Sequence, residues 1–163
     1  MLENSSLKIL VTNLNKLMLT FTDKPNYEAL ASRLSIKLST LKGWMSQKRM
    51  PTLKTIDKIA DCLGCHTYQL LKPDGQLENA GISFNDSSTI FLQNLQAIFN
   101  ENKKFSLIEK HNLVNSDYKP DDHYITETML ISNRRRIPPL KTLDYIARSL
   151  KVESYELLIP KIF

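Results

Sequence analysis

Apolar side chains recur every three or four positions along most of the chain, which is the spacing of one face of an α-helix. The spacing predicts helices over about 5–19, over 27–34, from Ser39 to about Gln47, from Pro51 and Thr52 up to Gly64, and over 67–71. A polar segment with glycine and proline follows, and the helical spacing resumes after 86–88. No segment alternates as a strand does, so the pattern predicts an all-α fold.

The pattern is also repeated. Residues 53–73 return as residues 140–160 without a gap, at a constant offset of 87 positions (140 − 53). A basic cluster and a proline precede both segments, at 47–51 and 134–138. A repeat of this length indicates two copies of one small domain. We therefore expect a first domain over 1–73, a linker over 74–88 and a second domain over 89–163.

The middle of the second copy is less regular than that of the first. Its two inner helices are predicted over about 106–113 and 126–133, and the segment 114–124 between them is too long for a helix–turn–helix turn. That segment carries Asp117, Asp121 and Asp122, which would repel phosphates. Whether this copy reads DNA bases is left open.

The segment 30–51 has the arrangement of a helix, a tight turn and a second helix. A small residue, Ala31, stands where the two helices would cross, and Ile36 would fill the turn. Leu41 and Trp44 would hold the second helix down. The open face of that helix would then carry Leu38, Ser39, Lys42 and Gly43. A helix exposed in this way fits the major groove of B-DNA, where base edges can be distinguished.

These residues resemble a known family. The motifs that carry the similarity are Leu-Ala-x-x-Leu from Leu30, Ile36, Ser-Thr-Leu-x-x-Trp from Ser39, Lys-Arg-x-Pro from Lys48 and the following Ile-Ala-x-x-Leu. They are similar to the Cro/C1-type family, also called XRE or lambda-repressor-like. The resemblance runs from about Leu30 to Leu71 and implies a five-helix domain. Together with the repeat, it leads us to expect two tandem five-helix lambda-repressor-like helix-turn-helix domains. It also implies sequence-specific binding of double-stranded DNA.

Carried over residue by residue, the resemblance puts the recognition helix at 38–46. The base-facing residues would be Leu38, Ser39, Lys42 and Gly43, and the phosphate-facing residues Tyr27, Gln47, Lys48 and Arg49. The chain departs from the family at Tyr27, where glutamine is frequent, and at Ser35 and Gln47, where glycine is frequent.

Composition fits this interpretation without proving it. The net charge is +5 and the sequence pI is about 9.2, which suits a polyanionic partner. No apolar window is long enough to span a membrane, and the first residues lack the pattern of a signal peptide, so we expect a cytoplasmic protein. No catalytic motif stands out, so we expect no enzyme activity.

The sequence Cys62-Leu-Gly-Cys65-His66 spells the attachment signature of c-type haem. In the second copy, however, serine, valine and glutamate stand at the three matching positions, so these are scaffold positions of the repeat. Two cysteines and one histidine also provide at most three of the four ligands that structural zinc requires. We therefore expect no cofactor and no metal.

The resulting hypothesis is a transcriptional regulator of prokaryotic or phage type, an origin that rests on the resemblance alone. The second domain would assist through phosphate contacts of Arg134, Arg135 and Arg136, or through dimerisation. An intramolecular pseudo-dimer and a homodimer both remain open. The alternative is a protein-interaction module that binds a protein partner through the 114–124 loop.

Overall fold

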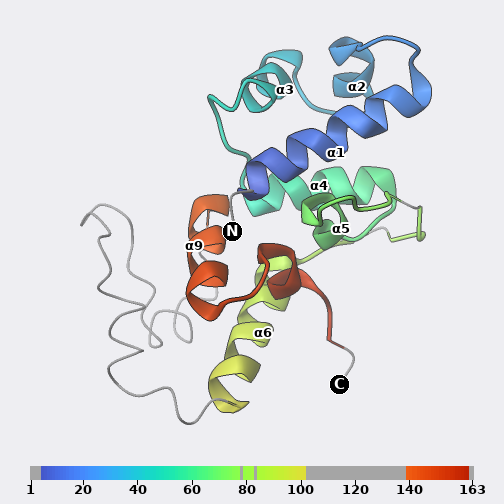
Figure 1. The fold of residues 1–163 in the computed structure, drawn as a ribbon. Helices are drawn as coiled ribbons and strands as arrows, with labels where there is room; N and C mark the ends of the chain where they lie inside the picture. The colour runs from blue at the N-terminus through green and yellow to red at the C-terminus, as the bar shows by residue number, and fades with distance from the viewer. Residues whose placement is uncertain (1–4, 78, 83, 102–138, 162–163) are drawn as a thin grey trace.

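The structure is a computed structural model that describes residues 5–77, 79–82, 84–101 and 139–161. The regular elements within these ranges are helices (Figure 1): α1 Ser6–Phe21, α2 Tyr27–Arg33, α3 Leu38–Met45, α4 Leu53–Leu63, α5 Thr67–Leu71, α6 Ser87–Glu101, α9 Leu140–Leu150 and the 3-10 helix η1 Ser154–Leu158. The all-α prediction is confirmed for this part of the chain. The predicted helices over 106–113 and 126–133 lie outside the described residues.

Side-chain caps and left-handed residues fix where the helices begin and end. Ser5, Asn26 and Thr52 each accept a hydrogen bond from the amide three residues later, at the starts of α1, α2 and α4. Gly64 ends α4 with a φ of 68°, and Lys151 ends α9 with a φ of 57°. These two residues occupy matching positions of the sequence repeat.

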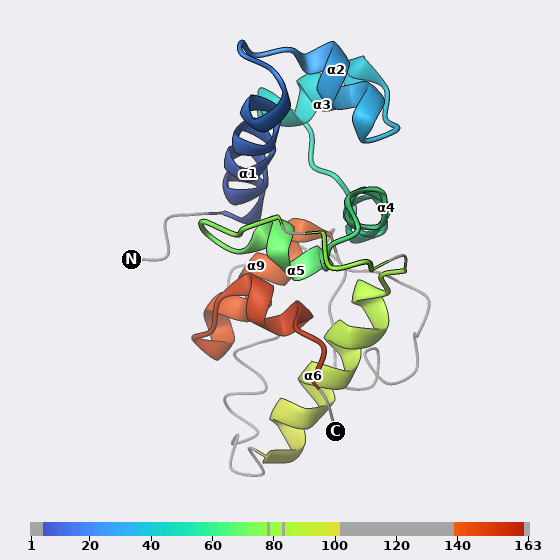
Figure 2. The ribbon, with the colours of Figure 1, turned by 90° about the vertical axis from the view of Figure 1, so that its right-hand side faces the viewer.

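One continuous apolar core joins all of the described helices. Figures 1 and 2 both place α2 and α3 at one end of the molecule and α6 at the other, with α4 and α5 between them. The fully buried side chains of this core include Leu10, Leu14, Leu30, Leu41, Leu53, Ile56, Ile59, Leu70, Phe91, Leu140, Leu143 and Leu71. None of the described helices has the length and apolar character needed to cross a membrane.

The same buried asparagine contact occurs twice. Asn13 on α1 donates through Nδ2 to the main-chain carbonyl oxygens of Leu70 and Lys72, at 2.9 and 3.0 Å. Asn94 on α6 donates in the same way, at 2.9 and 3.0 Å, to the two carbonyl oxygens that lie 87 positions further along the chain. Each of these first helices is therefore held to the last helix of its own half by the same buried amide.

The segment expected to be a linker packs against the end of α4. The amides of Ala80 and Ile82 both donate to the carbonyl oxygen of Gly64, at 2.8 and 3.1 Å. The buried Asn85 side chain donates to the carbonyl oxygen of Cys65 at 2.9 Å. α6 then begins at Ser87, inside the range assigned to the linker. The chain thus passes from α5 to α6 along the surface of α4.

Candidate nucleic-acid interface

The turn between α2 and α3 is closed by main-chain hydrogen bonds around a left-handed residue. The amide of Ile36 donates to the carbonyl oxygen of Ala31 at 3.0 Å, and Ser35 has a φ of 54°. Ala31 is buried and Ile36 is half-buried against the core, as the sequence predicts. A left-handed residue that is not glycine is strained. The turn nevertheless keeps its left-handed residue, although a serine stands at position 35 and not a glycine.

The third helix presents two different faces. Leu41 and Trp44 are 0% and 3% exposed, so one face is anchored in the core. Ser39 and Lys42 on the other face are exposed, while Leu38 and Gly43 are half-buried. The face that the sequence assigns to DNA bases is thus accessible in part, and its polar members are the most accessible.

The residues after α3 fold back onto it at Gly43. The amides of Lys48 and Arg49 both donate to the Gly43 carbonyl oxygen, at 3.0 and 3.1 Å, and Gln47 has a φ of 56°. A Cβ atom added to Gly43 would lie 3.1 Å from Cδ of Arg49. Glycine in a helix costs about 1 kcal/mol relative to alanine. Arg49 is exposed and its side chain can move by the few tenths of an ångström that a Cβ atom would need, so the contact alone does not require a glycine.

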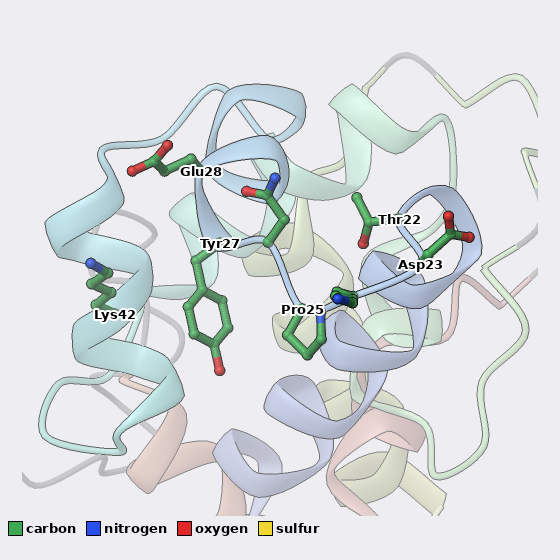
Figure 3. Close-up of a pocket in the computed structure, with 8 residues that line it drawn as sticks. Thr22, Asp23, Pro25, Tyr27, Glu28 and Lys42 are labelled. Atoms are coloured by element: carbon green, nitrogen blue, oxygen red, sulfur yellow. The ribbon is translucent and has the colours of Figure 1, made fainter.

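Tyr27 and Lys42 line one open depression between the start of α2 and α3 (Figure 3). The depression continues over residues 22–26 of the α1–α2 loop, and its rim carries both acidic and basic side chains. Tyr27 is half-buried and packs against the core. One residue predicted to contact a phosphate, Tyr27, and one predicted to contact a base, Lys42, therefore line the same depression.

The basic side chains of this surface are available to a partner. Lys42, Lys48 and Arg49 are exposed, and no carboxylate among the described residues forms an ion pair with them. Arg33 differs, because its guanidinium lies 4.8 Å from the centre of the Phe21 ring. The loop after α3 thus carries exposed cations that have no ion-pair partner among the described residues.

The two cysteines of the haem-like signature lie in different environments. Cys62 is exposed and Cys65 is fully buried. Burial raises the pKa of the Cys65 thiol to about 11, so this thiol stays protonated at neutral pH. Among the residues that the structure describes, no three His, Cys, Asp or Glu side chains gather as a metal site would require.

Several predicted site residues cannot be placed on this surface. Arg134, Arg135 and Arg136, and the loop 114–124, lie outside the described residues.

Residues 26–70 match the family model described as Helix-turn-helix. The match begins at the cap of α2 and ends within α5, so it contains the turn and α3. No curated protein and no solved structure matches the chain. The helix-turn-helix predicted from the sequence is thereby confirmed for residues 26–70, and the match suggests a DNA-binding regulator.

Proposed function

We propose that the chain is a sequence-specific DNA-binding transcriptional regulator, with α3 as the helix that enters the major groove. The observation that carries this proposal is the two-faced α3 inside the matched segment. Leu41 and Trp44 fix the helix to the core, and the opposite face with Ser39 and Lys42 is open to solvent. A helix held on one side and free on the other suits groove insertion.

The open face supplies side chains that can distinguish bases. Lys42 is an amine donor that suits the O6 and N7 acceptors of guanine. The Ser39 hydroxyl can donate or accept, and the Leu38 side chain can contact a thymine methyl group. Gly43 offers the duplex only its main chain, because the Arg49 side chain lies beside its Cα atom.

The flanks of the same surface supply phosphate contacts. Lys48 and Arg49 follow α3 directly and are exposed, and Gln47 stands beside them. Tyr27 lines the same depression as Lys42, and its hydroxyl can donate to a phosphate oxygen. These contacts would set the register of α3 on the duplex and make the affinity depend on salt.

The test is selection of bound DNA from a random library, followed by binding measurements with two double variants. Ser39→Ala/Lys42→Ala should abolish the preference for the selected motif. Lys48→Ala/Arg49→Ala should weaken all sequences alike and reduce the salt dependence of the affinity. Lys16→Ala is the matched control for a lost charge, because Lys16 pairs with Asp74 away from this surface.

Failure to enrich any motif at moderate salt would overturn the proposal. Loss of the motif in Lys16→Ala as well would show that charge alone, and not α3, carries the effect. The assistance of the second domain through Arg134, Arg135 and Arg136, the 114–124 protein-binding alternative and the cytoplasmic location stay predictions.

A further inference from the structure

The start of α6 is bonded to α4 by a buried carboxylate. Asp57 accepts hydrogen bonds from the main-chain amide of Ser87 at 3.1 Å and from the Ser87 hydroxyl. It also accepts from the Thr67 hydroxyl at 2.7 Å. Asp57 and Ser87 are 7% and 1% exposed. A carboxylate on the fourth helix of the first half thus holds the first helix of the second half.

The reverse contact is also present. Asp144 on α9 accepts hydrogen bonds from the main-chain amide of Ser6 at 3.1 Å and from the Ser6 hydroxyl. It also accepts from the Ser154 hydroxyl at 2.7 Å. The carboxylate of the second half thus holds the first helix of the first half, which makes the exchange between the halves reciprocal.

The sequence repeat shows that these two sets match member by member. Asp144 lies 87 positions after Asp57, the offset of the repeat. Both serines are the first residues of their helices, at Ser6 and Ser87. Reciprocal pairs of equivalent residues are the signature of a two-fold interface, in which residue i contacts j and j contacts i.

A contact on the axis supports the same symmetry. Thr52 and Pro139 form an isolated antiparallel bridge, and they too are 87 positions apart (139 − 52). A residue that pairs with its own equivalent must lie close to a two-fold axis. The antiparallel direction is the one that such an axis produces.

The connection between the halves identifies which second half occupies the interface. Residues 79–82 and 84–86 lie along the end of α4, with hydrogen bonds from Ala80, Ile82 and Asn85, and α6 begins at the next residue. The α6 that packs on α4 is therefore the one from the same chain, not one exchanged with a neighbouring molecule.

From these contacts we infer that the two halves form a closed pseudo-dimer within one chain. Each half already occupies these contacts of the other half, so a second chain cannot take them, and we expect the protein to be a monomer in solution. If the proposed DNA binding holds, on which this consequence rests, one chain occupies one complete site without recruiting a second.

The test places a disulfide on the axis. Directly opposed residues of an antiparallel pair have Cα atoms about 4.5–5.5 Å apart, which a disulfide can span. The variant Thr52→Cys/Pro139→Cys, in a Cys62→Ser background, should form an intrachain disulfide on mild oxidation. It should run as a compact monomer in denaturing gels and revert on reduction. Thr52→Cys alone, in the same background, is the control and should give no such band.

A disulfide-linked dimer, or no disulfide at all, would overturn the inference. Light scattering of the wild type gives a second readout. The mass should stay at 18.8 kDa as concentration rises, and one chain should bind each selected DNA site. A dimer in free solution overturns the closed interface. Absence of DNA binding overturns only the proposed function, because the disulfide and the free mass are measured without DNA.

Discussion

Removing the Asp57 carboxylate is the most direct test of how the two halves are held together. In Asp57→Ala, the Ser87 amide, the Ser87 hydroxyl and the Thr67 hydroxyl lose their shared acceptor. All three groups are buried. A buried polar group left without a partner costs about 1–3 kcal/mol, and water entering the space recovers part of this. We therefore expect the free energy of unfolding to fall by about 3–5 kcal/mol.

The reciprocal variant has a smaller expected effect, since Asp144 is only half-buried. It loses the equivalent three donors, from Ser6 and Ser154, and should cost about 2–3 kcal/mol. The exposed pair Lys54 and Lys141 occupies matching positions of the repeat. Lys54→Ala and Lys141→Ala should each change stability by less than about 0.5 kcal/mol.

Urea denaturation followed by circular dichroism measures these differences. With an m-value of about 2 kcal/mol per molar, a loss of 4 kcal/mol lowers the midpoint by about 2 M. Because both halves share one core, both aspartate variants should still unfold in a single transition. A negligible effect of Asp144→Ala beside a large effect of Asp57→Ala, or two separate transitions, would refute the reciprocal interface.

Three further outcomes follow from single residues. At pH 8, a thiol reagent should modify Cys62 and leave Cys65 unmodified until the protein is unfolded, because burial raises the pKa of Cys65 to about 11; equal labelling rates in the native state would contradict this. Gly64→Ala should lower the melting temperature, because an added Cβ would lie 2.3 Å from Oδ1 of Asn79 at a φ of 68°. Lys151→Gly should instead leave the melting temperature unchanged or raise it, since it relieves a φ of 57°; a loss of stability would count against that reasoning.

The sequence pattern predicted most of the local structure because each signal is short-range. Apolar spacing located α1 to α5, and small or turn-forming residues marked their ends. The resemblance also marks Ser35 and Gln47, because glycine is frequent at these two positions in the family that the chain resembles. Both residues have a positive φ in the structure. The pattern did not reveal that Ala80, Ile82 and Asn85 bond to the end of α4, because polar residues that bond to a helix end look the same in sequence as a solvated linker.

The contacts between the halves were beyond the sequence for a different reason. A repeat indicates that two segments fold alike, and an apolar face indicates that another element packs against it. Neither identifies which element that is. Ser6 and Ser87 look like ordinary helix caps, yet the capping side chains are those of Ser5 and Asp86. The serines themselves bond to aspartates of the other half, and that pairing becomes visible only in three dimensions.

The offset between the halves changes between the first pair of matching helices and the later pair, and that change bears on the proposed DNA site. The starts of α1 and α6 differ by 81 positions, whereas the starts of α4 and α9 differ by 87. The second half therefore has six more residues (87 − 81) between these helices. The reciprocal contacts involve only the helices on either side of this difference, so they restrain the flanks and leave the intervening sequence free to diverge. The reciprocally bonded helices would then be nearly symmetric, while the DNA-contacting segments of the two halves differ. We therefore expect the selected DNA motif to lack the palindromic symmetry that identical half-sites would give.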